Sequence, residues 1–319
     1  MRKPTAVYLV LFALSMSYAP PAVSCDLCAI YRGTEAKLSK PGFNVGVFEQ
    51  FTHFGTLQDN GEEVPDDAGQ YLDSSITQFI LGYQINERAG LQVNVPYISR
   101  TFRRPEGFDI DKGAESGLGD MSLMGNLRLF EEVGIDTIFI WDAFGGVKFP
   151  TGDAGRLQEE FDEVEVSGAP ESGIHGHDIA LGSGSYDVVI GSSASYHWKR
   201  IFTTAAVQYA IRTRGAYGYR YADDLNWSVK PGGYLYLTDE ATAGLQLALT
   251  GEAKGKDTFQ GERAADTGIT SVFAGPELSF TWKEKLSVDL GADFPVARHN
   301  TSLQIVPDFK IRAALVWRM

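Results

Sequence analysis

The chain alternates hydrophobic and polar residues with a period of two over most of its length. In 91–100, Leu91, Val93 and Val95 share one parity, and Gln92 and Asn94 occupy the other. This alternation predicts strands with one apolar and one polar face. About twelve segments follow it, namely 43–57, 72–85, 91–100, 121–130, 137–149, 186–198, 201–215, 225–237, 242–253, 269–282, 285–296 and 303–319.

The connections between these segments are sorted by length. Short connections lie near 86–90, 131–136, 199–200, 238–241 and 283–285, and mostly longer ones near 58–71, 104–119, 150–185, 216–224, 254–268 and 297–302. Short periplasmic turns that alternate with long external loops are typical of outer-membrane barrels. A secreted β-sandwich has shorter strands and no reason to sort its loops. We therefore predict an all-β fold, a single antiparallel transmembrane β-barrel of about twelve strands over 43–319.

Two further features bear on this barrel. Trp198, Trp282 and Trp317 fall at predicted periplasmic strand ends on the apolar parity, where an aromatic belt is expected. Proline lacks the N–H that a closed barrel needs from every residue of a strand. We therefore expect bulges or bends at the prolines inside predicted strands, which are Pro96, Pro231, Pro276, Pro295 and Pro307.

The first residues resemble an export signal. Arg2 and Lys3 precede an apolar run over 6–14, and small residues follow at 22–24. This pattern predicts an N-terminal signal peptide over 1–24, and the run is too short to span a bilayer. We expect 25–42 to form a periplasmic leader long enough to enter the barrel as a partial plug.

Cys25 and Cys28 form a CxxC pair in this leader. Three interpretations stay open: a short local disulfide, a redox or metal-binding CxxC, and lipidation of Cys25. Two cysteines in 319 residues are too few for a disulfide scaffold.

The charge excludes one class of partner. A formal net charge of -13 and a pI near 4.9 argue against a nucleic-acid binder, which would need a basic surface. Most of the acid excess lies in the predicted outer loops 58–71 and 150–185. The acidity therefore describes the outer rim and says little about the lumen.

The predicted lumen wall carries both signs of charge in nearly equal number. Balanced charge predicts mutual ion pairs rather than a filter of one sign. A twelve-stranded barrel has room for a narrow path and not for a wide porin channel. The lumen-facing candidates are Arg100, Arg128, Asp142, Lys148, His197, Arg212, Lys230, Glu252, Glu277, Asp289, Asp293, Asp308, Lys310 and Arg312.

Few residues suggest chemistry. His175, His177 and Asp178 in the third outer loop could ligate a transition metal, and the alternative is a solvated polar loop. An outer-membrane lipid hydrolase would need a serine beside a histidine on the lipid-facing surface. His197 shares its parity with two serines, but that parity faces the lumen. We expect no enzyme activity and no cofactor.

Three strings resemble a known family of outer-membrane barrels, which is named after the meta-cleavage pathway of phenol degradation. They are Gly117–Leu123, Gly146–Asp153 and Leu181–Asp187, and Val95-Pro96-Tyr97 and Gly275-Pro276-Glu277 also look like its strand motifs. The resemblance covers roughly 43–319 and implies a transporter-like barrel that admits small or hydrophobic compounds. The chain departs from the pattern at the terminal Met319, where an aromatic residue is usual, and in the CxxC leader.

The pattern and the resemblance together predict an outer-membrane channel or transporter for passive or gated passage of small, including hydrophobic, solutes. The alternative is a non-conducting structural or surface barrel whose CxxC binds a periplasmic partner, and a lipid hydrolase is less favoured. Expected partners are outer-membrane lipid, a small-molecule solute and the barrel assembly machinery, with no nucleic acid. The expected location is the cell outer membrane of a Gram-negative-type bacterium.

Overall fold

The computed structural model describes residues 41–162 and 166–319. The predicted signal peptide, Cys25, Cys28 and all but the last two residues of the predicted leader lie outside the described residues. The acidic residues 163–165 of the third outer loop also lie outside them.

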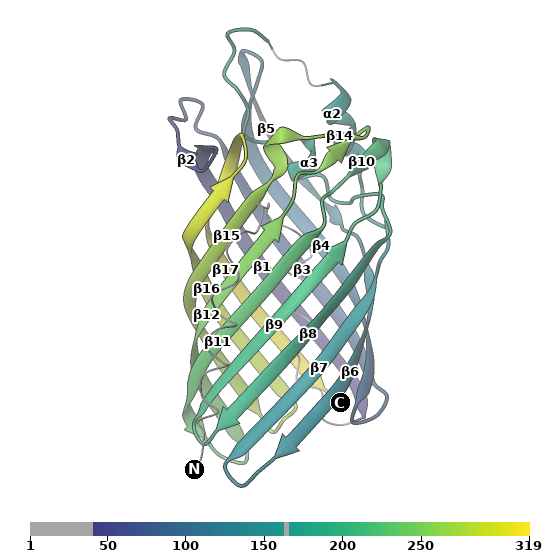
Figure 1. Cartoon of the computed structure of the whole chain (residues 1–319), viewed down its shortest axis with the longest axis vertical. Helices are drawn as coiled ribbons and strands as arrows, with labels where there is room; N and C mark the ends of the chain where they lie inside the picture. Colours follow the sequence, from purple (N-terminus) through teal and green to yellow (C-terminus); the bar gives the residue numbers. More distant parts are fainter. Residues whose placement is uncertain (1–40, 163–165) are drawn as a thin grey trace, which may run out of the picture.

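Twelve long strands of the described chain form one closed antiparallel barrel (Figure 1). The barrel closes because the last strand pairs with the first from Asn44 with Arg318 to Asp59 with Leu303. Each predicted segment corresponds to one strand, so the predicted fold class is confirmed. The strands are β1 (Gly42–Asp59), β3 (Tyr71–Gln84), β4 (Ala89–Glu106), β6 (Ser122–Val133), β7 (Thr137–Lys148), β8 (Asp187–Trp198), β9 (Ile201–Ile211), β11 (Asp224–Leu237), β12 (Ala241–Lys254), β15 (Ile269–Trp282), β16 (Leu286–Asn300) and β17 (Leu303–Arg318).

Residue parity sorts side chains between the outside of the barrel and its lumen. On β9, Val207, Tyr209 and Ile211 are exposed on the outer face, whereas Gln208 and Ala210 are buried. Successive strand residues point to opposite faces, so one register error would exchange the two sets. A hydrophobic band against lipid and a polar interior both follow from this alternation.

The segment 104–119 was expected to be a loop, and the structure corrects this. β4 runs on to Glu106, and β5 (Asp109–Leu118) folds back along the half of β4 from Tyr97 to Glu106, nearer the long loops. The lower half of β4 pairs instead with β6. The chain steps from β5 to β6 across 119–121, opposite Pro96, whose carbonyl accepts a hydrogen bond from Gly119 N. A proline that cannot donate explains why the ladder changes register here.

The other strand prolines also interrupt ladders. The register shifts beside Pro295, where Phe273 pairs with it, and around Pro307, which pairs with Phe54. Pro231 and Pro276 each lie in a gap of the ladder on one side of their strand. The expected bulges are therefore found at Pro295 and Pro307. Pro96 marks the change of partner strand, and at Pro231 and Pro276 ladder pairs are missing on one side.

The two ends of the barrel differ (Figure 1). Short turns, the C-terminal end of β17 and the exposed Trp198, Trp282 and Trp317 lie at one end. The longer loops lie at the other end, although 297–302 is no loop, because only residues 301 and 302 separate β16 from β17. Within the described residues no helix is long and apolar enough to cross a membrane. The loops contain β2 (Glu62–Glu63), η1 (Gly155–Gln158), α2 (Glu159–Asp162), α3 (Gly176–Ile179), η2 (Ala216–Gly218), β10 (Tyr219–Arg220), β13 (Thr258–Phe259), β14 (Glu262–Arg263) and η3 (Ala265–Thr267).

Candidate functional site

The three strings that carry the family resemblance meet inside the upper barrel, around the Asp120 carboxylate. Its Oδ2 accepts hydrogen bonds from Ser183 N at 2.9 Å and Ser183 Oγ at 2.7 Å, and it pairs with Lys148 Nζ. Its Oδ1 accepts one from Gly152 N at 3.0 Å. One buried carboxylate therefore joins the β5–β6 step, the end of β7 and the returning loop before β8.

A second carboxylate extends this cluster along the wall. Asp187, fully buried at the start of β8, lies 3.0 Å from Lys148 Nζ and 3.1 Å from the Arg212 guanidinium. Arg212 in turn donates two hydrogen bonds to Asp224 Oδ2, at 3.0 Å and 2.9 Å. Buried charges are tolerated only when they are paired in this way.

Glycines make the close approach of these strings sterically feasible. A Cβ on Gly182 would come within 2.5 Å of the Gly152 backbone, and a Cβ on Gly152 within 2.6 Å of the Leu181 carbonyl oxygen. Gly184 has a φ of +67°, which residues with a side chain rarely adopt. The glycines of the second and third strings are therefore explained by backbone packing.

The loop held by this cluster folds into the lumen and meets an apolar wall. Ile174, Ile179 and Leu181 pack against inward side chains of β1, β3, β4 and β17. The backbone is fixed as well, because Ile305 N donates to the Gly173 carbonyl at 2.9 Å and Arg100 donates to that of Ala180. The lumen is thus less uniformly polar than the balance of charges indicated.

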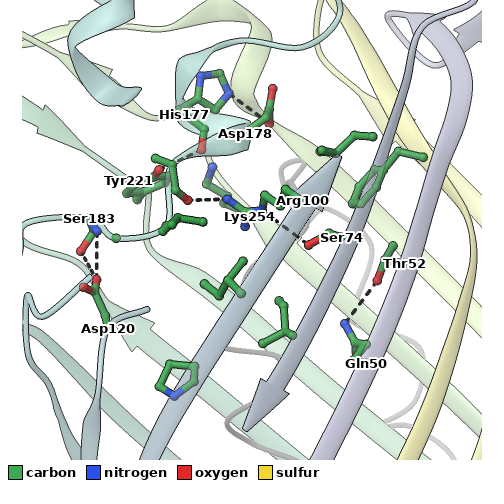
Figure 2. Close-up of a pocket in the computed structure, with 18 of the residues that line it drawn as sticks. Gln50, Thr52, Ser74, Arg100, Asp120, His177, Asp178, Ser183, Tyr221 and Lys254 are labelled. Carbon is green, nitrogen blue, oxygen red and sulfur yellow. Dashed lines mark hydrogen bonds and ion pairs between the residues drawn. The ribbon is translucent and has the colours of Figure 1, made fainter. Parts of the chain in front are cut away.

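An upper cavity of about 100 Å³ remains beneath this loop (Figure 2). In this view Ser74 and Thr52 lie on one side, Asp120 and Ser183 on the other, and Arg100 and Lys254 beside each other in the middle. The sequence-predicted residues Arg100, Lys148 and Arg212 all line it. Its apolar lining consists of Phe54, Leu72, Ile76, Pro96, Ile98, Ala180, Leu181 and Ile305.

A lower cavity of about 640 Å³ occupies the half nearer the short turns. The predicted Arg128, Asp142, His197 and Asp289 line it, and Arg128 Nε donates to Asp142 Oδ1 at 3.1 Å. His197 Nδ1 lies 3.1 Å from the Tyr234 hydroxyl. Ser193 and Ser195 also line this cavity.

Six predicted charges form an ion-pair belt in the lumen, and three of them, Lys230, Glu277 and Arg312, also line the lower cavity. Arg312 pairs with Glu277 and, at 2.7 Å, with Asp293. Lys230 reaches Glu277 at 3.2 Å. Lys310 on β17 crosses two intervening strands to Glu252 on β12, also at 3.2 Å. The belt consists of Lys230, Glu252, Glu277, Asp293, Lys310 and Arg312, which confirms the expected mutual pairing.

Asp308 is the predicted lumen residue that the structure places elsewhere. It is the extra residue of the bulge beside Pro307 and bonds Thr56 Oγ1 at 2.6 Å and Arg298 at 2.7 Å. Its neighbour His53 has the outward parity of β1 and bonds Asp73 at 2.6 Å. Alternation alone assigned Asp308 to the lumen, but the bulge breaks that alternation.

The proposed metal ligands form ion pairs within the outer loops instead. The rings of His175 and His177 stack with centroids 5.7 Å apart, and His175 Nε2 lies 3.2 Å from Asp266. His177 Nδ1 lies 2.9 Å from Glu160 and its Nε2 3.4 Å from Asp178. Across 41–162 and 166–319, no three His, Cys, Asp or Glu side chains are placed to hold a metal ion.

The His177 pair is strongly charged despite its burial. Burial by itself lowers the pKa of His177, but Asp178 and Glu160 outweigh it and raise this pKa to about 10. Burial likewise raises the pKa of Glu160, and His177 outweighs it and lowers this pKa to about 2. Both groups are therefore ionised at neutral pH and hold α2 against α3.

Comparison with solved structures agrees with this architecture. The chain is similar to an outer membrane channel from Pseudomonas putida F1, with 15% identity, a TM-score of 0.60 and coverage of 90% of this chain and 98% of that one. Two further similar structures are more distant. The β domain of the Bordetella autotransporter BrkA has 8% identity and a TM-score of 0.48, with 88% of this chain and 100% of that one covered. The NalP translocator domain of Neisseria meningitidis has 12% identity and a TM-score of 0.44, with 92% of this chain and 94% of that one covered. No protein-family model and no curated protein matches the chain. The chain is a barrel of the outer-membrane type, and at these identities the likeness shows the fold alone.

The sequence missed several residues that organise the site. Asp120, Ser183 and Asp187 are in the resembling strings, yet only Lys148 among those strings was singled out as a wall charge. Gln78 is not recognisable from the sequence, because an uncharged residue on the inward parity gives no signal of its own. Its position opposite the β5–β6 step is visible only in the closed barrel.

Replacement of the central carboxylate should loosen the inward loop. We expect Asp120→Asn to destabilise the folded barrel by about 2–4 kcal/mol, because it leaves buried Lys148 short of one of its two carboxylates. Chemical unfolding of the refolded protein measures this. Asp136→Asn is the control, since Asp136 forms an exposed pair with Lys199 at 3.7 Å and should change stability by less than about 0.5 kcal/mol. Equal small effects of both would contradict the buried role of Asp120.

The His177–Glu160 pair should stabilise the loops over a defined pH range. The contribution of His177 is complete below its ordinary pKa of 6.5 and is lost as pH rises through about 10. The contribution of Glu160 is complete above its ordinary pKa of 4.5 and is lost as pH falls through about 2. We expect Glu160→Gln to lower the His177 pKa, measured by NMR titration of the imidazole, and exposed Glu171→Gln to leave it unchanged. A His177 pKa near 6.5 in the wild-type protein would be incompatible with this pairing.

Proposed function

We propose that the protein is an outer-membrane channel that lets small solutes, including partly hydrophobic ones, pass through its lumen. The observation that carries this proposal is the pair of cavities inside one closed barrel, which also holds the ion-pair belt. On β17, Lys310 lies between Ile305 of the upper cavity and Arg312 of the lower one. Solutes would therefore move from the outer loops past the belt to the end with short turns.

The chemistry of the walls supports solutes of mixed character. The upper cavity has isoleucine and leucine side chains on one side and paired charges on the other. Paired charges cost a polar solute little and do not select ions of one sign. The fold resemblance to the Pseudomonas putida channel and the resemblance of the three strings to the phenol meta-pathway family agree with this proposal. Outer-membrane lipid and the barrel assembly machinery would be its partners.

Conductance in planar bilayers tests the proposal. We expect currents from the mature chain, and larger ones from Lys310→Gln/Glu252→Gln, which removes the tie across the lumen without leaving an unpaired charge. Arg298→Gln/Asp308→Asn is the control because it removes a pair at the outward bulge. A deletion of 25–42 shows whether the leader restricts the current. Silence in every variant would favour the non-conducting barrel with a CxxC partner site.

A further inference from the structure

The upper cavity contains one buried polar side chain that the protein itself does not satisfy. Gln78 is fully buried on β3 and lines this cavity. Within the described residues, neither its Nε2 nor its Oε1 has a hydrogen-bond partner. A buried amide without partners costs stability, so its presence at a cavity wall indicates that a ligand supplies the missing bonds.

Along the barrel axis, the wall around Gln78 presents polar side chains, then apolar ones, then a polar one again. On β3, Ile76 lies between Ser74 and Gln78, and on β4 Ile98 lies between Pro96 and Arg100. Ile76 and Ile98 are register partners, as are Ser74 and Arg100. All of these side chains line the cavity. The wall therefore has a guanidinium at its outer side, an apolar floor in the middle and a free amide at its inner side.

The charge of the cavity lining favours an anion at the outer side. Arg100, Lys148, His177, Arg212 and Lys254 line the cavity, against two carboxylates, those of Asp120 and Asp178. The further acids that pair with three of these cations, Asp187, Asp224 and Asp257, stand behind them and not in the cavity lining. Glu160 likewise stands behind His177. The cluster is therefore nearly neutral as a whole, but cations outnumber carboxylates in the lining itself, so an anionic group in the cavity would contact mainly cationic groups.

Size and hydrogen bonding narrow the ligand further. A cavity of about 100 Å³ is somewhat smaller than the roughly 150 Å³ that holds benzene, so the ligand is at most one small ring. A hydroxyl group can donate to Gln78 Oε1 and accept from Gln78 Nε2, which satisfies both atoms at once. A carboxylate is the anion best matched to the Arg100 guanidinium.

We propose that the upper cavity is a binding site for a small hydroxylated acid, with its carboxylate toward Arg100, its apolar body over Ile76 and Ile98, and its hydroxyl on Gln78. This assignment rests on the proposed channel function and names its solute class. Gln78 is the residue that distinguishes a hydroxylated acid from the plain acid.

Calorimetric titration of the purified mature protein in detergent tests the site with three probes. We expect 4-hydroxybenzoate to bind about tenfold more tightly than benzoate, which lacks the hydroxyl. We also expect it to bind about tenfold more tightly than 4-hydroxybenzamide, which lacks the charge. Equal affinities for the three, or no binding of any, would overturn the proposal.

Variants separate recognition from a structural role of the glutamine. Gln78→Leu should reduce 4-hydroxybenzoate affinity to that of benzoate, leave benzoate affinity unchanged and keep the thermal stability of the empty barrel, since the lost amide had no partner. Gln208→Leu is the control, a buried lumen glutamine on β9 outside the cavity lining. If Gln78→Leu weakens both acids equally or lowers stability, Gln78 does not recognise the hydroxyl. Binding without conductance would support this site and contradict the channel proposal. Conductance without binding would support the channel and contradict this site.

Discussion

The structure depends on the pairing of β1 with β17, which closes the sheet. A bilayer offers no hydrogen bonds, so an open edge at membrane depth would leave a row of backbone groups unsatisfied. Closure satisfies them over the full length of both strands, from Asn44 with Arg318 to Asp59 with Leu303. It also creates an interior in which a buried charge must find a partner.

The interior meets this demand in two ways. The ion-pair belt joins strands that are not neighbours, and the Asp120 cluster joins the outer loop to the wall. The belt and the cluster do not fill the lumen, and the space that remains forms the upper and the lower cavity. The same pairing that stabilises the fold therefore divides the proposed path into two compartments.

Much of this was predictable from alternation alone. The twelve strands, the sorting of loops and the inward position of Arg312 or Glu277 follow from a period of two and from loop length. The failures have two causes, a β-bulge that breaks the period and a strand that has no apolar face. Asp308 left the lumen at such a bulge, and 104–119 is a β-hairpin whose polar exposed strand gives no apolar face to recognise. The roles of Asp120 and Gln78 depend on contacts between segments far apart in sequence, which a local pattern does not contain.

The most direct test of a continuous lumen is cysteine labelling from the outer side of intact cells, in a background without Cys25 and Cys28. Ser193 lines the lower cavity, beyond the belt. Its neighbour Ser192 faces outward, and its hydroxyl donates to the Asp142 carbonyl. The two variants are Ser193→Cys and Ser192→Cys. A small membrane-impermeant thiol reagent should modify Ser193→Cys and spare Ser192→Cys. If Ser193→Cys reacts only after the periplasmic side is opened, no solute path crosses the barrel.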